Sequence, residues 1–247
     1  MQKTMIVTGG GRGIGAAVAR LAASQGYAVC VNYLRNAQAA DALVREIAES
    51  GGKAIAVQAD VGIQAQAARL FEAVDAQLGT ADVLVNNAGL LGSRLVAEMD
   101  EDELDRVFRA NVYSMFFCSR EAVRRMSTRL GGKGGAIVNL SSVASRLGGL
   151  AGGSHYAATK GAIDSFSLAL AKEVGAEGIR VNAVRPGLIR TDIHAVHGGP
   201  DKLEALGRTT PLGRTGTAEE VAQTVLWLAS PQASYVHSAV LDVAGGR

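Results

Sequence analysis

The order of apolar segments along the chain is the feature that most constrains its fold. Seven short runs rich in Val and Ile alternate with longer, Ala-rich amphipathic stretches. The apolar runs cover residues 4–8, 27–32, 54–58, 83–86, 136–140, 180–184 and 239–243, and the helical patterns cover residues 13–25, 36–50, 62–79, 101–130, 155–177 and 217–230. Continuous apolarity over about five residues is typical of strands buried on both faces. The alternation therefore predicts βαβ units and a doubly wound α/β fold, with seven parallel strands and helices on both faces of the sheet.

Two helix starts have the spacing of a capping box, Asp100 with Glu103 and Thr217 with Glu220. No linker-like composition and no internal repeat divides the 247 residues, so we expect a single domain over residues 1–247. Residues 192–210 form the one long segment without a predicted strand or strong helix. Loops of that length in compact domains are commonly functional, and we predict a substrate lid around residues 192–210.

The composition gives no electrostatic reason for a nucleic-acid or membrane partner. The chain has 25 Lys and Arg against 23 Asp and Glu, a net charge of +2, and no run of five like charges. The two cysteines lack CxxC spacing, and no apolar run approaches the ~18 residues of a membrane helix. We therefore expect a soluble, cytoplasmic protein with reduced thiols. The four histidines do not cluster with carboxylates, so no metal site is expected.

A glycine-rich turn, GGGRGIG, covers residues 9–15 between the first predicted strand and the first predicted helix. Amides at a helix N-terminus lack intrahelical partners, the helix dipole favours an anion there, and glycine lets the backbone approach a pyrophosphate. This position in a βαβ unit predicts a dinucleotide site. The glycines fit Gly9-x-x-x-Gly13-x-Gly15, and Gly11-x-Gly13-x-x-Ala16 fits the ordinary fingerprint as well.

The end of the second predicted strand indicates which dinucleotide binds. NAD enzymes place an acid there for the ribose 2′-hydroxyl, but this sequence reads NYLRN over residues 32–36, with no carboxylate before Asp41. Arg12 and Arg35 can both reach that corner, and a guanidinium binds a phosphate bidentately. We therefore predict that NADP(H) is preferred over NAD(H).

Polar motifs end or follow the later strands. The sequence NNAG (residues 86–89) ends the fourth strand and two serines (141–142) end the fifth, at the carboxyl edge where doubly wound sheets bind ligands. Tyr156 and Lys160 lie four residues apart on a predicted helix and share one face. An ammonium beside a phenol favours the phenolate, so we expect Lys160 to lower the pKa of Tyr156. Such a phenol can protonate a carbonyl oxygen or deprotonate an alcohol.

Taken in order, these motifs resemble those of the short-chain dehydrogenase/reductase family over the full length of the chain. The motifs that carry the resemblance are Thr8-Gly9 with Gly13 and Gly15, Asn86 to Gly89, Asn111, Ser142, Tyr156 with Lys160, and Pro186-Gly187 with Thr191. The resemblance implies a single Rossmann domain that transfers hydride between a nicotinamide cofactor and a carbonyl or alcohol.

The resemblance also implies roles for side chains. Tyr156 would be the general acid/base, while Lys160 would lower its pKa and hold the nicotinamide ribose. Ser142 would hydrogen-bond the substrate oxygen, and Asn111 would anchor a water relay leading to Lys160. Together with the 2′-phosphate corner, the residues expected to bind the cofactor are Gly9, Arg12, Gly13, Ile14, Gly15, Asn32, Tyr33, Arg35, Asp60, Val61, Asn87, Ala88, Gly89, Tyr156, Lys160, Pro186, Gly187, Ile189 and Thr191.

Two positions depart from the family pattern. Ser142 and Tyr156 are 14 residues apart, one more than the family spacing, and the glycines at 148–149 and 152–153 could absorb the extra residue in a loop. Ser142 is preferred as donor to the substrate oxygen, with Ser141 as the alternative. The dipeptide His237-Ser238 stands where the family often has Thr-Gly.

The favoured function is an NADP(H)-dependent oxidoreductase that acts on a small carbonyl or secondary alcohol. One alternative is a 3-oxoacyl-[acyl-carrier-protein] reductase, with Arg124, Arg125 and Arg129 as a basic patch for the acidic carrier protein, although Glu177 stands where such reductases often carry a base. A remote alternative is a sensor that binds NADP(H) without catalysis.

The resemblance implies a homotetramer, with one interface from residues 101–130 and 155–177 and another from the last strand and residues 217–230. The substrate wall is expected from residues 93–96, 149–154, Leu188 and the lid. His155, His194 and His197 are its polar candidates.

Overall fold

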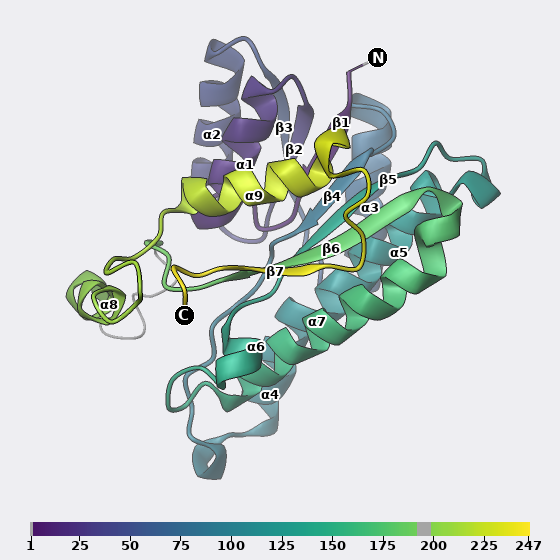
Figure 1. Ribbon diagram of the computed structural model, residues 1–247. Helices are drawn as coiled ribbons and strands as arrows, with labels where there is room; N and C mark the ends of the chain where they lie inside the picture. Colours follow the sequence, from purple (N-terminus) through teal and green to yellow (C-terminus); the bar gives the residue numbers. More distant parts are fainter. Residues whose placement is uncertain (1, 192–198) are drawn as a thin grey trace.

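A computed structural model describes residues 2–191 and 199–247 of the chain. Its sheet has seven strands, all parallel, in the order β3-β2-β1-β4-β5-β6-β7 (Figure 1). The strands are β1 (Thr4–Val7), β2 (Ala28–Tyr33), β3 (Lys53–Gln58), β4 (Val83–Asn86), β5 (Gly135–Leu140), β6 (Ile179–Pro186) and β7 (Val240–Val243). The order reverses between β1 and β4, which creates the crevice where doubly wound folds bind ligands. The predicted fold class is confirmed.

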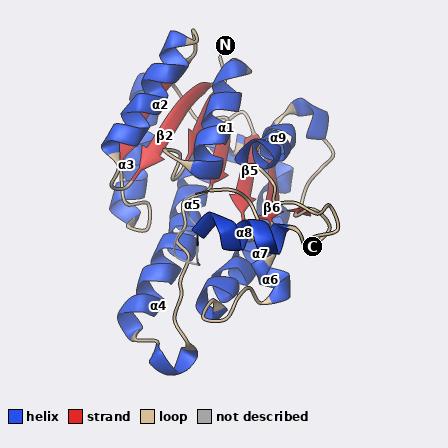
Figure 2. Cartoon of the chain, turned by 90° about the vertical axis from the view of Figure 1, so that its left-hand side faces the viewer, coloured by secondary structure: helices blue, strands red, loops and turns tan. Residues whose placement is uncertain are grey.

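Nine α-helices are present in the described part of the chain. They are α1 (Gly13–Ser24), α2 (Ala37–Glu49), α3 (Gln64–Gln77), α4 (Glu101–Phe108), α5 (Ser114–Met126), α6 (Ala144–Leu147), α7 (Ser154–Val174), α8 (Gly199–Gly207) and α9 (Ala218–Ala229). Figure 2 shows helices on both sides of the sheet. One apolar cluster joins the sheet to α1, α2 and α9, and a second joins its other face to α3, α5 and α7.

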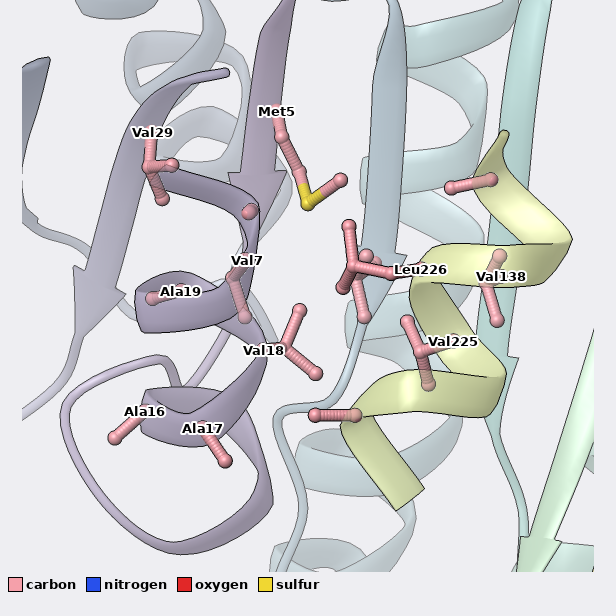
Figure 3. Packing of buried hydrophobic residues seen from close by; sticks show 14 of the residues in the cluster. Met5, Val7, Ala16, Ala17, Val18, Ala19, Val29, Val138, Val225 and Leu226 are labelled. Carbon is pink, nitrogen blue, oxygen red and sulfur yellow. The ribbon is translucent and has the colours of Figure 1, made fainter. Parts of the chain in front are cut away.

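The strands are apolar throughout because both faces are covered. Met5 and Val7 of β1 pack beneath Val18 and Leu226 (Figure 3), whereas Ile6 between them belongs to the opposite cluster. The second cluster also contains both cysteines, which are free thiols. Burial raises the pKa of Cys30 to about 12 and raises that of Cys118 as well, so neither is a reactive thiolate at neutral pH.

The predicted helix over residues 101–130 is not continuous. It consists of α4, a π-helical turn (Arg109–Tyr113), α5 and a 3-10 turn (Thr128–Leu130). Such π turns insert a residue into a helix and occur often at functional sites. The inserted turn contains Asn111, whose side chain is buried and hydrogen-bonded to other elements. The predicted helix 155–177 likewise ends at Val174 and continues as a 3-10 turn (Gly175–Glu177).

The predicted lid, residues 192–210, is not free of helix. Residues 192–198 lie outside the described residues, and Gly199–Gly207 forms α8. This short helix is stabilised by its leucines, since Leu203 is buried and lines a pocket together with Leu206.

Only one of the two predicted capping boxes is complete. Thr217 and Glu220 satisfy each other's amides at the start of α9. At α4, Asp100 accepts a hydrogen bond from the Glu103 amide, but the Glu103 side chain bonds to Arg106 and His155 instead of closing the box.

Candidate active site

The glycine turn between β1 and α1 is clamped to the end of β4. The Thr8 hydroxyl accepts hydrogen bonds from the amides of Asn87 and Ala88, both at 3.0 Å. In return, Asn87 Nδ2 donates to the carbonyls of Thr8 (2.9 Å) and Gly9 (3.0 Å). A Cβ on Gly15 would lie 2.5 Å from Asn87 Nδ2 and 2.6 Å from the Gly9 oxygen. These contacts leave no room for a side chain at residue 15.

Two glycines in the turn have left-handed backbone conformations, with φ of +60° at Gly9 and +53° at Gly13. L-residues adopt this region at a cost, whereas glycine does not. A Cβ on Gly13 would lie 3.3 Å from Thr191 Cγ2, so the segment after β6 reaches the glycine turn. Arg12 makes no side-chain cap at the start of α1, which leaves first-turn amides available to an anion.

Asn32 at the end of β2 is buried and holds the turn in place. Its Oδ1 accepts from the Gly9 amide at 3.2 Å, and its Nδ2 donates to the carbonyls of Val57 (3.2 Å) and Ala59 (3.1 Å). The side chain predicted to bind the cofactor is thus used to position the turn against β3.

The corner beyond β2 carries the two arginines. Arg12 and Arg35 are exposed, and neither pairs with an acid in the described part of the chain. Tyr33 beside them is half-buried. After the end of β3, Asp60 Oδ1 accepts from the Gly62 amide at 2.9 Å, and Val61 is buried.

A pocket opens at the carboxyl edge of the sheet next to the glycine turn. Many of the predicted site residues line it together. They are Ile14, Asn87, Gly89, Ser141, Ser142, Tyr156, Lys160, Pro186, Gly187, Leu188, Ile189 and Thr191. Residues from β1–α1, β4, β5, α7 and β6, far apart in the sequence, therefore meet at one place, as the parallel topology predicts.

Ser142 and Ser141 differ in what they contact. Ser142 accepts a hydrogen bond at its Oγ from the Ala144 amide at 3.1 Å, and its hydroxyl lowers the pKa of Tyr156. The buried Ser141 hydroxyl donates to the backbone oxygen of Lys160 at 3.0 Å. The geometry therefore favours Ser142 as the donor beside the phenol and leaves Ser141 to tie β5 to α7.

Tyr156 and Lys160 lie together, but the pKa of the phenol does not move in the predicted direction. Burial raises the pKa of Tyr156, and the hydrogen bond with Ser142 opposes that rise. Lys160 Nζ lies 5.6 Å from the centre of the Tyr156 ring and donates to the Leu140 carbonyl at 2.8 Å. Burial also lowers the pKa of Lys160, to about 8. Desolvation is therefore the largest influence on the pKa of both groups.

Asn111 is held beside this pair by the β4–α4 loop. Its Oδ1 accepts from the Leu90 amide at 2.7 Å, and its Nδ2 donates to the Leu90 carbonyl and the Thr159 hydroxyl, both at 3.0 Å. A Cβ on Gly89 would lie 3.2 Å from Asn111 Oδ1 and 3.8 Å from Lys160 Nζ. The π turn therefore brings Asn111 close to Lys160.

Comparison with known proteins agrees with this arrangement. A family profile described as "Enoyl-(Acyl carrier protein) reductase" matches residues 9–247. The chain is 48% identical over 243 residues to the uncharacterized oxidoreductase YgfF of Escherichia coli strain K12, covering 98% of each protein. It is 38% identical over 246 residues to the 3-oxoacyl-[acyl-carrier-protein] reductase FabG of Staphylococcus aureus strain Mu50, covering 100% of this chain and 98% of that protein. A crystal structure of a blue fluorescent protein from a metagenomic library in complex with NADPH superimposes with a TM-score of 0.90 at 35% identity, covering 99% of this chain and 97% of that one.

The chain belongs to the short-chain dehydrogenase/reductase family. It is an NAD(P)-dependent oxidoreductase, and its cofactor is a nicotinamide dinucleotide.

The pocket wall beyond the cofactor residues is richer in leucine than predicted. Residues not singled out from the sequence are Leu90, Leu91, Gly92, Leu140, Val143, Ala144, Leu147 and Arg247. Of the predicted wall, Gly149, Leu150, Gly153, Leu188 and, from the lid, Lys202, Leu203 and Leu206 line the pocket, whereas residues 93–96 do not. The helix α8 within the lid was not predicted, and the available signal for it was that its two leucines are three residues apart and share a face.

The predicted histidines do not form a polar wall in the described structure. His155 is buried under the β4–α4 loop, where a Cβ on Gly92 would overlap its ring, and Nε2 lies 3.3 Å from Glu103 Oε1. His194 and His197 lie outside the described residues. Among the described residues, no cluster of three or more His, Cys, Asp and Glu side chains has the arrangement of a metal site, and none of the described helices is long and apolar enough to span a bilayer.

Proposed function

We propose that the protein is an NADP(H)-dependent carbonyl reductase, or secondary alcohol dehydrogenase in reverse, with Tyr156 as general acid/base. The observation that carries the proposal is that Ser142, Tyr156 and Lys160 line one pocket, into which Ile14 of the glycine turn also reaches. The effect of Ser142 on the pKa of Tyr156 supports two neighbouring hydroxyls in this wall. A carbonyl oxygen bound there would accept from both hydroxyls.

The residues present fit a bound dinucleotide. Glycines at positions 9 and 13 adopt positive φ, position 15 admits no Cβ, and the first turn of α1 lacks a side-chain cap. These features form a backbone cradle for a pyrophosphate. Bound in this cradle, the nicotinamide dinucleotide supplies or accepts the hydride.

The protein's own residues handle the proton. Because burial raises the pKa of Tyr156, the phenol is protonated at neutral pH and can donate to a carbonyl oxygen that gains charge as hydride arrives. Lys160 has its ammonium directed at the Leu140 carbonyl beside the pocket, where it can hold ribose hydroxyls. Asn111 positions the β4–α4 loop near Lys160 and is proposed to anchor the water relay.

The preference for NADP(H) follows from the corner beyond β2. Arg12 and Arg35 are exposed there, and the described sequence from residue 32 to residue 40 contains no acid. Two guanidiniums attract a 2′-phosphate, which an acid would repel. The NADPH complex of the similar blue fluorescent protein supports this choice.

The leucine-rich wall favours an apolar carbonyl substrate. Leu91, Leu147, Leu150, Leu188, Leu203 and Leu206 line the pocket, and apolar walls bind ligands through area removed from water. An aryl ketone or an aliphatic diketone fits this lining better than a keto sugar, whose hydroxyls would lose water without replacement partners.

The ion pairs formed by the predicted basic patch argue against the carrier-protein alternative. Arg124 contacts Glu121 at 3.1 Å, Arg125 contacts Asp75 at 2.7 Å, and Arg129 contacts Glu177 at 2.7 Å. Each cation is thus paired within the chain, so the patch offers an acidic carrier little net attraction. The similarity to FabG keeps a 3-oxoacyl thioester among the substrates to test.

We also propose a homotetramer in the cytoplasm. Tyr113 and Phe116 near the start of α5 are exposed, as are Leu168 on α7 and Trp227 on α9, so both predicted interfaces present apolar side chains. The two buried free thiols fit a reducing compartment. Light scattering tests the assembly, and a monomer at micromolar concentration would refute it.

Turnover by matched tyrosine variants tests the function. NADPH oxidation is followed over an aryl ketone, a diketone, a quinone, a keto sugar and a 3-oxoacyl thioester, with Tyr156→Phe and, as control, Tyr235→Phe at a fully exposed site. We expect the apolar ketones to be reduced by the wild type and the control, and Tyr156→Phe to be inactive. Equal turnover by Tyr156→Phe would overturn the assignment of the acid.

A further inference from the structure

Lys160 is a buried cation with little local compensation. The residue is 5% exposed, and its Nζ makes one hydrogen bond in the described structure, to the Leu140 carbonyl at 2.8 Å. No acid in the described part of the chain lies within ion-pair distance of Nζ. An ammonium in such a place tends to lose its proton unless a negative charge nearby favours the charged form.

Asp164 is the carboxylate that can supply this negative charge. It follows Lys160 by four residues on the same face of α7 and is 7% exposed. Helical side chains lean toward the helix N-terminus, so the Asp164 side chain leans toward the turn that carries Lys160. Its Oδ1 is buried without a hydrogen-bond partner in the described structure. One face of α7 thus carries Tyr156, Lys160 and Asp164 at successive turns.

Arg185 of β6 holds the other oxygen of this carboxylate. Its Nε and Nη2 lie 3.0 and 2.9 Å from Asp164 Oδ2, where α7 packs along β6 (Figure 1). Arg185 Nη1 also contacts Asp242 Oδ1 of β7 at 3.5 Å, and Asp242 pairs with Arg146 of α6 at 2.9 Å. Arg185 is therefore shared between two carboxylates and does not cancel the charge of Asp164 alone.

We propose that Asp164 is a positioning residue that keeps Lys160 in its ammonium form, and that Arg185 limits how strongly the Asp164 charge acts on Lys160. The inference rests on the proposed role of Lys160 in holding the cofactor ribose. The electrostatics agree, since burial lowers the pKa of Lys160 to about 8 and the Asp164 carboxylate acts in the opposite direction. Tyr156 also faces Lys160, and the cations of Lys202 and Arg247 line the same pocket.

The proposal predicts that two neighbouring substitutions shift the pH at which Lys160 deprotonates in opposite directions. Asp164→Asn removes the negative charge while keeping the shape, so Lys160 should deprotonate at lower pH. Arg185→Gln removes the opposing positive charge while keeping a donor to Asp164, so Lys160 should deprotonate at higher pH. A residue that only supported the packing of α7 against β6 would move both variants in the same direction.

The test is the pH dependence of NADPH binding between pH 6.5 and 10, followed by cofactor fluorescence, with kcat/KM measured wherever a substrate turns over. We expect the alkaline midpoint of binding to fall by about one pH unit in Asp164→Asn and to rise in Arg185→Gln. Asp242→Asn is the matched control, because it removes the other carboxylate on Arg185, whereas Asp164 is the carboxylate that acts on Lys160. Its midpoint should shift far less than that of Asp164→Asn.

Unchanged midpoints in both Asp164→Asn and Arg185→Gln, or shifts of the same sign, would overturn the inference. If Asp164→Asn does not fold, as judged by circular dichroism, the sign of the Arg185→Gln shift decides alone. Binding is measured without turnover, so a failure to find a carbonyl substrate refutes the proposed function and leaves this test intact.

Discussion

The contact between Gly15 and Asn87 allows one prediction to be worked out in detail. In Gly15→Ala, the new Cβ would lie 2.5 Å from Asn87 Nδ2, 2.6 Å from the Gly9 oxygen and 2.9 Å from Gly10 Cα. The Gly9 and Gly10 atoms belong to the backbone, which yields less readily than a side chain. The Asn87 side chain must therefore move, and its hydrogen bonds to the carbonyls of Thr8 and Gly9 are strained or lost. The clamp between the glycine turn and β4 is therefore weakened.

The expected magnitude follows from three effects. Overpacking costs about 1–3 kcal/mol, and each lost hydrogen bond costs about 1 kcal/mol. Alanine in place of glycine in a helix returns up to about 1 kcal/mol. We expect the free energy of unfolding to fall by about 2–4 kcal/mol relative to wild type. The NADPH dissociation constant should rise at least about tenfold, which corresponds to about 1.4 kcal/mol of binding free energy.

Urea unfolding and NADPH fluorescence titration measure the two effects. Gly161→Ala is the matched control, because a Cβ at that helical position of α7 has no neighbour within 4 Å. It should stabilise the protein by about 0.5–1 kcal/mol. A Gly15→Ala protein as stable as wild type, with an unchanged dissociation constant for NADPH, would refute the reasoning.

Three further predictions concern charge and capping. Arg35→Glu places an acid at the exposed corner beyond β2 and should lower the ratio of NADPH to NADH affinity by at least about tenfold, or about 1.4 kcal/mol. An unchanged ratio in paired titrations would exclude Arg35 from the 2′-phosphate site. Thr217→Ala removes the side chain that accepts from the Glu220 amide at 3.3 Å and should cost about 0.5–2 kcal/mol in urea unfolding, whereas an equal unfolding midpoint would contradict the capping role. Hydrogen bonds from Arg214 and the Thr217 amide lower the pKa of Glu220 from 4.5 to about 2. The contribution of Glu220 to stability is therefore fully present above pH 4.5 and is lost as pH falls toward 2. The difference in unfolding free energy between wild type and Glu220→Gln should shrink over that pH range, and a constant difference would contradict the assignment.

The sheet was predictable because its strands are buried on both faces. Val83–Asn86 has the predicted bounds, and the other six strands differ from prediction by one or two residues at one or both ends. A continuous run of Val and Ile has one stable place in such a fold, between two layers of helices. The meeting of β1, β4, β5 and β6 at one edge then follows from parallel pairing, which explains why so many predicted residues line a single pocket.

Features that depend on distant partners were not predictable in the same way. The π turn around Asn111 is stabilised by bonds to Leu90 and Thr159, which are 21 and 48 residues away. The pairing of Arg129 with Glu177 joins residues 48 positions apart, so a basic patch in the sequence is neutralised in the fold. The direction of the Tyr156 pKa shift depends on burial, which a four-residue spacing cannot reveal.

A single turnover with NADPH deuterated at the transferring C4 position tests the central claim most directly. The best apolar ketone is mixed with the wild type or Tyr156→Phe, each preloaded with the labelled cofactor, and the product is analysed by mass spectrometry. We predict that the wild type gives an alcohol with deuterium on the carbinol carbon. Tyr156→Phe should bind the cofactor within a few-fold of wild type but form product at least about 10²-fold more slowly. Deuterated product formed at the wild-type rate by Tyr156→Phe would contradict the account, because the proton would then come from another group.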